Sequence, residues 1–154
     1  MKKTTKQPDH KVIRNRRARF DYELGDSLVA GLQLSGRETK ALRLGHGQLR
    51  GAYVTIKDSE LWLINASIHG TPGMPISESE QTQARKLLVK QREINALLEA
   101  KQQGRTIVPL EILTHGRYIK LRLAVGKGKK HYDKRQVLKA RDEDRQIHRV
   151  LRNQ

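Results

Sequence analysis

Apolar and polar residues alternate in two stretches of the first half of the chain, and alternation with a period of two predicts β-strands. The first stretch, residues 28–35, has four apolar residues on one face: Leu28, Ala30, Leu32 and Leu34. The second, residues 52–57, is separated from the apolar residues 61–64 by Asp58-Ser59, a turn sequence. We therefore expect a strand followed by a hairpin. Residues 36–44, between these stretches, are rich in helix formers and predict a short helix.

The second half of the chain predicts one long helix and two further strands. Ser77 followed by Glu80 forms a capping-box pattern, and Gly104 is a natural helix end. Between them runs a mostly helical apolar stripe: Ala84, Leu87, Leu88, Ile94, Leu97 and Leu98. Residues 106–113 and 118–125 then alternate as two strands. The apolar face of the last strand is Ile119, Leu121, Leu123 and Val125.

These elements together predict a mainly β fold. Five or so strands with two or three helices are typical of a small β-barrel, closed or partly open. Residues 12–125 are numerous enough to bury one core, so we expect a single domain there. Residues 126–154 would follow it as a basic C-terminal tail.

The tail is helical by composition from Lys134 onward, but its apolar residues are interrupted across residues 141–146. A helix with such an interrupted apolar stripe is not expected to pack against the core. Four arginines lie on one helical face at spacings of four, four and three: Arg141, Arg145, Arg149 and Arg152. Their mutual repulsion weakens an isolated helix, whereas a row of phosphates would stabilise it. We therefore expect a tail that is disordered alone and helical when bound to a polyanion.

Positive charge is concentrated at the two ends of the chain. The 154 residues carry a net charge of +16. Residues 1–20 hold eight Lys or Arg and one Asp, and residues 126–154 hold ten Lys or Arg and four Asp or Glu. The ends thus supply 13 of the 16 excess charges. Charge sorted in this way favours a nucleic-acid partner, and we expect residues 1–11 to form a flexible basic N-terminus.

The composition argues against several classes of protein. There is no cysteine, which excludes disulfides, thiolate chemistry and zinc sites with cysteine ligands. The six histidines show no helical i,i+4 pair and no recurring ligand spacing, so we expect no bound metal. The N-terminus has no apolar run behind its charges, and no stretch approaches the roughly 18 apolar residues of a membrane span. We therefore expect a cytoplasmic protein without a membrane partner.

No pattern of residues predicts catalysis. Glu38 could be interpreted as a general base, but it lies close to Lys40 and Arg43 in the sequence. A carboxylate among cations is more often an organiser of ion pairs with a lowered pKa than a proton acceptor. No Ser/His/Asp arrangement is suggested either. We therefore expect no enzyme activity and no cofactor.

Two basic runs and three tyrosines are candidates for contacts with RNA. The arginines of residues 14–19 could hold phosphates, although such arms can also serve solubility alone. In residues 126–135, Tyr132 stands between cations, which suits a base stacked over a phosphate clamp. A solvated linker with Tyr132 packed on the body is the alternative. Tyr53 and Tyr118 are placed on polar strand faces, where they either stack on bases or pack across strands.

Four motifs follow one another along the chain. They are Asn15-Arg-Arg-Ala-Arg-Phe-Asp-Tyr22, Gly36-Arg-Glu-Thr-Lys-Ala-Leu-Arg43, Arg85-Lys-Leu-Leu88 and Gly126-Lys-Gly-Lys-Lys-His-Tyr-Asp-Lys-Arg135. In this order they closely resemble the SsrA-binding protein family, or small protein B, and the likeness runs from about residue 12 to 152. The resemblance implies an oligonucleotide-binding-like barrel and no catalytic site.

The function that the resemblance implies is that of an RNA-binding adaptor for ribosome rescue, or trans-translation. Such a protein binds the tRNA-like domain of transfer-messenger RNA and delivers that RNA to stalled ribosomes. Its C-terminal tail occupies the empty decoding centre and message channel of the small ribosomal subunit. We expect a monomer when the protein is free. On charge alone, a ribosomal protein or a general RNA chaperone is the alternative.

By position, the resemblance implies two sets of RNA-binding residues. The set for transfer-messenger RNA is Asn15, Arg16, Arg17, Lys40, Arg43, Arg85, Lys86 and Leu88. The set for the decoding centre and channel is Gly128, Lys129, Lys130, Tyr132, Asp133, Lys134, Arg135, Arg141, Arg145 and Arg149. The chain departs from the family at Phe20, where the family usually has His. It also departs at Val29, where the family has an acidic residue that is linked to RNA binding.

Overall fold

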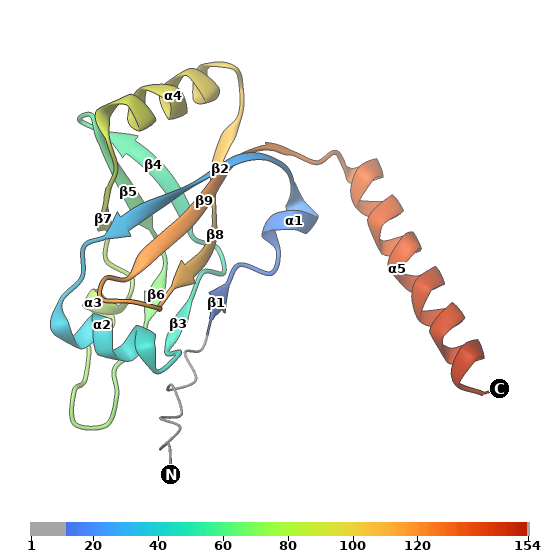
Figure 1. Cartoon of the computed structure of the whole chain (residues 1–154), viewed down its shortest axis with the longest axis horizontal. Coiled ribbons are helices and arrows are strands. Elements are labelled where there is room, and N and C mark those ends of the chain that lie inside the picture. The colour runs from blue at the N-terminus through green and yellow to red at the C-terminus, as the bar shows by residue number, and fades with distance from the viewer. Residues whose placement is uncertain (1–11, 154) are drawn as a thin grey trace, which may run out of the picture.

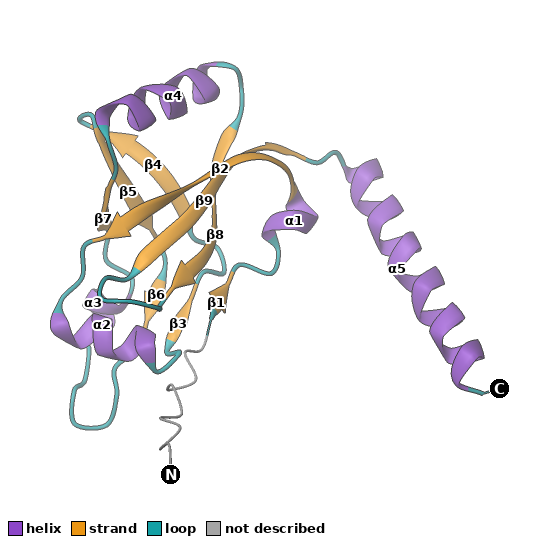
Figure 2. Cartoon of the chain, in the orientation of Figure 1, coloured by secondary structure: helices purple, strands orange, loops and turns teal. Residues whose placement is uncertain are grey.

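The computed structural model describes residues 12–153, apart from the side chains of residues 131–133. The predicted flexible N-terminus, residues 1–11, lies outside the described residues. The described part is mainly β, as predicted, with an antiparallel main sheet, a small second sheet and five helices. Figure 2 shows the strands gathered in one body and the last helix standing away from it.

The main sheet contains seven strands, all paired antiparallel. Their order across the sheet is β1 (Ile13–Arg14), β8 (Thr106–Leu113), β9 (Lys120–Gly128), β2 (Tyr22–Leu32), β7 (Arg85–Leu88), β5 (Glu60–Ile64) and β4 (Tyr53–Lys57). The second sheet pairs β3 (Gly47–Gln48) with β6 (Ser67–Ile68). Within the described residues, hydrogen bonds do not close the main sheet into a barrel.

The five helices lie at the ends of the sheet or beyond it (Figure 1). They are α1 (Ala18–Asp21), α2 (Gly36–Arg43), α3 (Glu78–Gln81), α4 (Gln91–Gln102) and α5 (His131–Arg152). The predicted short helix is confirmed as α2. In Figure 1, α4 and α2 lie at opposite ends of the body, and α5 points away from it. Across residues 12–153, no helix is both long and apolar enough to cross a bilayer.

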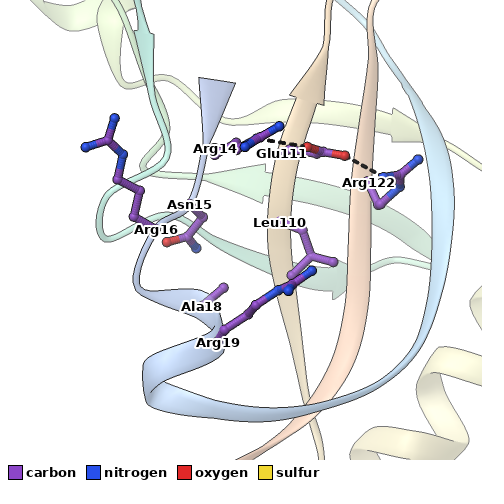
Figure 3. Close-up of a pocket in the computed structure, with 8 residues that line it drawn as sticks. All are labelled: Arg14, Asn15, Arg16, Ala18, Arg19, Leu110, Glu111 and Arg122. Atoms are coloured by element: carbon purple, nitrogen blue, oxygen red, sulfur yellow. Dashed lines mark hydrogen bonds and ion pairs between the residues drawn. The ribbon is translucent and has the colours of Figure 1, made fainter. Parts of the chain in front are cut away.

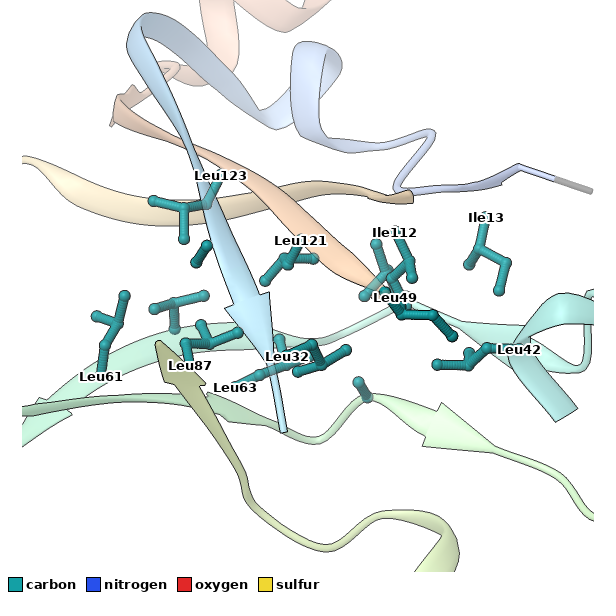
Figure 4. Close-up of a cluster of buried hydrophobic side chains, with 14 of the residues drawn as sticks. Ile13, Leu32, Leu42, Leu49, Leu61, Leu63, Leu87, Ile112, Leu121 and Leu123 are labelled. Carbon is teal, nitrogen blue, oxygen red and sulfur yellow. The ribbon is translucent and has the colours of Figure 1, made fainter. Parts of the chain in front are cut away.

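The core forms where the apolar faces of the strands meet (Figure 4). The predicted alternation of the last strand is confirmed, because its apolar face is buried: Ile119, Leu121, Leu123 and Val125. Leu61 and Leu63 of β5 and Leu87 of β7 are buried in the same cluster. Burying each such side chain stabilises the fold by roughly 1.5–3 kcal/mol relative to leaving it exposed.

The predicted hairpin is confirmed as β4 and β5, with Tyr53 opposite Ile64 and Lys57 opposite Glu60. Its turn residues, Asp58 and Ser59, both have positive φ angles of 52° and 60°. Two consecutive residues in this left-handed region match the twist of the flanking strands, as in a type I′ turn. The predicted strand at 106–113 is confirmed as β8, whereas the other two are longer or shifted: β2 already begins at Tyr22, and β9 continues to Gly128.

The predicted long helix over residues 77–104 is wrong. Only one turn follows Ser77, and residues 85–88 instead form β7, between β2 and β5. The helix begins only at Gln91. Its N-terminus is capped by the Glu93 carboxylate, which accepts a hydrogen bond of 2.8 Å from the Lys90 N–H. The neighbours Leu87 and Leu88 suggested one helical face, but they point to opposite sides of a strand. Leu87 is buried and Leu88 is exposed.

Candidate nucleic-acid interface

The basic run of residues 14–19 crosses the edge of the main sheet and is held there by Asn15. The backbone N–H of Asn15 donates to the carbonyl of Leu110 at 2.7 Å, and its side-chain Nδ2 donates to the carbonyl of Pro109 at 2.9 Å. The sheet register shifts between Pro109 and Glu111, which leaves these carbonyls available. Asn15 therefore fixes the turn that presents Arg16 and Arg17, both of which are exposed.

A wide groove lies beside this turn. Its volume is 1430 Å³, and it runs between residues 12–18, the loop before β4 and the start of β8. Arg16, Arg17, Arg50 and Tyr53 contribute to its lining. Cations next to an exposed aromatic ring can hold a phosphate and stack a base, so the groove has the chemistry for a nucleic-acid strand.

Lys40 and Arg43 lie on α2, which begins with a capping box. The Ser35 hydroxyl accepts from the Glu38 N–H at 3.2 Å, and the Glu38 carboxylate accepts from the Ser35 N–H at 3.1 Å. Lys40 is exposed. Arg43 instead donates to three carbonyls of the β8–β9 loop, those of Thr114, Gly116 and Arg117, at 3.0–3.1 Å. Its first role in the fold is to tie that loop to α2.

The structure does not place Arg85 where the sequence prediction needed it. Its side chain is only 2% exposed, and its Nε donates to Oε2 of Glu38 at 2.5 Å. The two terminal nitrogens donate to four backbone carbonyls, those of Ala66, Glu80, Gln81 and Gln83. Since a guanidinium has five N–H donors and all are engaged, Arg85 has none left for a phosphate. Its role here is to hold α2, β7 and the segment around α3 together.

Glu38 is an organiser of ion pairs, as its charged sequence neighbours suggested, but its partner is Arg85. Burial alone would raise the pKa of Glu38, whereas hydrogen bonds from Arg85 and Ser35 outweigh it and lower that pKa below its ordinary value. A buried carboxylate held in its charged form is a poor proton acceptor. Glu38 therefore belongs to the fold and not to a catalytic site.

Lys86 and Leu88 lie on the outer face of β7. Lys86 Nζ contacts Oε1 of Glu60 at 2.9 Å, and both side chains are partly exposed. Leu88 is 55% exposed, and its β-strand neighbour is Gly31 of β2. A Cβ atom at Gly31 would lie 3.3 Å from Cβ of Leu88, so a side chain there would press on Leu88. The exposed Val29 lies on the same face of β2, two residues away.

The segment before the last helix is bonded to α1. The Lys129 N–H donates to the Asp21 carbonyl at 2.9 Å, and Lys129 Nζ donates to the Arg19 carbonyl at 2.9 Å. Lys134, in the first turn of α5, contacts Oδ1 of Asp21 at 3.3 Å. Partial burial would raise the pKa of Asp21, but hydrogen bonds from Arg17 and Lys134 lower it below its ordinary value.

Phe20 of α1 lies among three cations. The ring centre is 5.3 Å from the Arg17 guanidinium, 5.9 Å from Lys134 Nζ and 5.8 Å from the Arg141 guanidinium. Cations over an aromatic face are attracted by its quadrupole, by about 0.5–1 kcal/mol each at exposed sites. Phe20 thus joins the first three turns of α5 to α1. Nothing in the sequence pattern signalled this contact.

The outer part of α5 carries the predicted arginine face away from the body (Figure 1). Arg135, Arg145 and Arg149 are exposed, and Arg145 has only a solvent-exposed contact with Asp142 at 3.8 Å. The helix has 22 residues and so spans about 33 Å. Gly128 ends β9, and Lys130 lies in the connection that follows. The side chains of Tyr132 and Asp133 lie outside the described residues, so their predicted contacts stay predictions.

The arrangement therefore consists of two basic surfaces joined at α1. One covers the N-terminal turn and the outer face of the main sheet, and the other is the length of α5. Between residues 12 and 153, leaving aside the side chains of 131–133, no group of three or more His, Asp or Glu is placed to hold a metal ion. The chemistry available is that of anion binding over extended surfaces.

Comparisons with known proteins agree on one family. Residues 12–153 match the family described as "SmpB protein". An SsrA-binding protein of Trichormus variabilis is 41% identical over 152 residues, covering 96% of this chain and 97% of that protein. The SsrA-binding protein of Sphingomonas elodea is 44% identical over 144 residues, covering 92% of this chain and 90% of that protein.

A solved structure agrees with these relatives. A chain from the work described as "tmRNA-SmpB: a journey to the center of the bacterial ribosome" superposes with a TM-score of 0.65. It is 34% identical in sequence, and the match covers 86% of this chain and 95% of that one. At this identity the likeness extends to sequence as well as to fold.

Proposed function

The chain belongs to the SmpB family of SsrA-binding proteins, and on that premise we propose how its surfaces perform the family's task. It is an RNA-binding adaptor that binds transfer-messenger RNA (tmRNA) and acts in trans-translation on the ribosome. It is not an enzyme. The observation that carries the mechanism is the separation of two basic surfaces, one on the body and one on α5, with α1 between them.

The body surface binds the tRNA-like domain of tmRNA in this proposal. Its exposed cations Arg16, Arg17 and Lys40 hold phosphates, and Lys86 with Leu88 offers a mixed ionic and apolar contact. Asn15 and Arg43 act through the segments that they anchor, because their side chains donate hydrogen bonds to backbone carbonyls of the body. Arg85 contributes to this surface only by supporting it from the interior.

The tail surface enters the empty decoding centre and message channel. Gly128, Lys129 and Lys130 connect it to the body, and Lys134 orients its first turn. The exposed arginines Arg135, Arg145 and Arg149 meet the phosphates of ribosomal RNA, and Tyr132 and Asp133 reach the decoding nucleotides. Arg141 is held against Phe20 in the structure and would be shared between the body and the RNA.

The free tail is disordered in this proposal and becomes helical on the ribosome. The described side chains of α5 are exposed from residue 138 onward, including the apolar ones: Leu138, Ile147, Val150 and Leu151. A helix of this kind gains most of its stability from a surface that covers it. Ribosomal RNA and protein would supply that surface, and their location would place this protein in the cytoplasm.

The body corresponds, in our proposal, to a partly open oligonucleotide-binding-like barrel. Strand β4 is the last strand in the hydrogen-bonded order of the main sheet. It nevertheless lies close to β8, which is the second strand in that order. The sheet is therefore strongly curved, which supports the barrel interpretation. Curvature of this kind leaves the outer faces of β2, β7 and β9 open to a large RNA.

Removal of residues 131–154 tests the two-surface mechanism. The cut is made after Lys130 because β9 continues to Gly128 and Lys129 bonds to α1, so an earlier cut would damage the body. We expect the shortened protein to keep its affinity for tmRNA within about threefold, and to lose the tagging of peptides on stalled ribosomes. Equal loss of both activities would refute a separate tail function.

A matched control variant distinguishes the loss of charge from α5 from the loss of the same charge elsewhere on the protein. The triple variant R141Q/R145Q/R149Q removes three positive charges from α5, and R92Q/K101Q/R105Q removes three from the far end of the body. Only the first is expected to abolish tagging while leaving tmRNA binding in place. If the two variants lose tagging to the same extent, net charge and not the tail accounts for the effect.

A further inference from the structure

The outer face of the main sheet carries four residues that lie directly opposite one another on four neighbouring strands. Arg14 of β1 is paired with Glu111 of β8, and Glu111 with Arg122 of β9. Arg122 is in turn paired with Val29 of β2. Figure 3 shows Arg14, Glu111 and Arg122 in line across the strands. Neither Glu111 nor Arg122 was a candidate in the sequence analysis, and Arg14 was one only as a member of the basic run of residues 14–19.

Glu111 is the shared partner of the two arginines. Its Oε1 accepts a hydrogen bond from Nη1 of Arg122 at 2.5 Å, and its Oε2 lies 3.7 Å from Nε of Arg14. The Glu111 side chain is 17% exposed, whereas those of Arg14 and Arg122 are 70% and 45% exposed. One carboxylate cannot neutralise two guanidinium groups, and each guanidinium has further N–H donors that face solvent. The row therefore keeps a net positive charge and unused donors.

A pocket of 510 Å³ lies beside this row. It is lined by Arg14, Glu111 and Arg122 of the row, together with Asn15, Arg16, Ala18, Arg19 and Leu110. In Figure 3 the Arg19 side chain reaches across toward Leu110, while Arg16 points away from the row. Four arginines and one glutamate thus surround a single hollow, which gives the hollow a net positive charge.

The hollow continues along the sheet toward the tail. A second pocket of 780 Å³ shares Arg19, Leu110 and Arg122 with the first. Its lining extends to Val29 on β2 and to Lys129, the residue that is bonded to α1 before the tail begins. The two pockets together form a basic track from the N-terminal turn to the root of α5.

We propose that this track binds the phosphodiester backbone of RNA, with Arg14 and Arg122 as its phosphate ligands. The proposal rests on the function proposed above and adds a site to it. Guanidinium groups bind phosphates through paired N–H donors, more strongly than through a single point charge. Because the track connects the two basic surfaces, a strand that is bound at the N-terminal turn can follow it toward the tail. Val29 offers an apolar contact to a ribose at its edge.

Glu111 is the counter-charge that a phosphate competes with at this site. In the free protein it reduces the repulsion between Arg14 and Arg122 and holds both side chains over the track. When a phosphate arrives, the carboxylate competes with it for the same donors. Removal of that negative charge is therefore expected to strengthen phosphate binding, whereas removal of the arginines weakens it.

Titration of the full-length protein with tmRNA at several KCl concentrations tests the site. The variant R14Q/R122Q is compared with K101Q/R105Q, which removes the same charge at the far end of the body. We expect R14Q/R122Q to bind roughly tenfold more weakly than K101Q/R105Q. The slope of log affinity against log salt should become shallower by about one to two for R14Q/R122Q, since each lost phosphate contact contributes about 0.7–0.9.

A second variant separates phosphate binding from a loss of fold. E111Q should bind tmRNA more tightly than the parent protein and with a steeper salt slope. Damage to the sheet would weaken binding in both E111Q and R14Q/R122Q, so opposite signs support the site. Equal binding by R14Q/R122Q and K101Q/R105Q, or weaker binding by E111Q, overturns it.

The same titration distinguishes a failure of the proposed function from a failure of the proposed site. If the parent protein does not distinguish tmRNA from an unrelated structured RNA of equal length, the proposed function fails and this site fails with it. If the parent protein binds tmRNA selectively while R14Q/R122Q and K101Q/R105Q behave alike, the function stands and only the site is wrong.

Discussion

Nε of Arg85 donates a hydrogen bond of 2.5 Å to Oε2 of Glu38, and both side chains are almost completely buried. The pair joins β7 to α2, and its two residues are 47 positions apart in the chain. Around it, four backbone carbonyls accept the remaining donors of Arg85. A buried ion pair whose hydrogen bonds are all made is costly to break at one side only, because the other charge is then left unpaired.

Arg85→Met should lower the free energy of unfolding by about 3–5 kcal/mol, since it leaves the Glu38 carboxylate buried without its partner. Urea unfolding followed by circular dichroism measures the change. Lys86→Met is the matched control, because the neighbouring Lys86–Glu60 pair is partly exposed and should contribute less than about 1 kcal/mol. A stable Arg85→Met protein with weak tmRNA binding would instead assign Arg85 to the RNA surface.

Stability should fall in acid because of Glu38. Its pKa is lower in the folded protein than its ordinary value of 4.5, so the pair stabilises the fold above about pH 4.5. That contribution is lost as the pH falls through the lower, folded pKa. Glu38→Gln should therefore be less stable than the parent at pH 7 and lose less stability between pH 5 and pH 3. Denaturant unfolding across this range gives the comparison, and parallel curves for the two proteins would contradict it.

Phe20→Leu should loosen the first turns of α5 from α1. It removes the ring that Lys134 and Arg141 approach, at a cost of roughly 1 kcal/mol, which corresponds to about a fivefold change in an opening equilibrium. Hydrogen exchange of amides in residues 134–141 measures this opening. Phe20→Tyr keeps the aromatic face and should exchange like the parent. Identical exchange in Phe20→Leu would mean that the ring does not hold the helix.

The helical content of the tail should rise when a polyanion is bound. NMR carbon chemical shifts of residues 142–152, beyond the turns held by Phe20, measured in the full-length protein with and without a ribosomal RNA fragment, report that content directly. We expect small helical shifts in the free protein and large ones in the complex, since phosphates relieve the repulsion along the arginine face. The variant R141Q/R145Q/R149Q should show a smaller increase. A tail already fully helical in the free protein would contradict the expectation.

The strands were predictable wherever one face was apolar and the other polar. Residues 106–113 and the apolar face of the last strand follow that pattern and are observed. β7 did not follow it, because one of its two buried positions is Arg85, whose charge is compensated by Glu38 from a distant helix. A local pattern cannot contain that information. The adjacent leucines then completed a false helical stripe.

The candidate site was predictable as a list of charged residues but not as a surface. Exposed arginines at 16 and 17 and along the tail follow from composition and spacing. The row of Arg14, Glu111 and Arg122 depends on the register of β1, β8 and β9, which brings together residues about a hundred positions apart. The cluster of cations around Phe20 likewise depends on where α5 leaves the sheet.

The shortness of α1 has a mechanical consequence. With only four residues, it carries the contacts of the body with the arm, which is about 33 Å long when it is helical. A rotation of about 10° at the contact between α1 and the arm displaces the far end of the arm by about 6 Å, slightly more than the rise of one turn of helix. A small movement of the N-terminal turn, when that turn binds tmRNA, would therefore cause a much larger displacement of the far end of α5, which contacts ribosomal RNA.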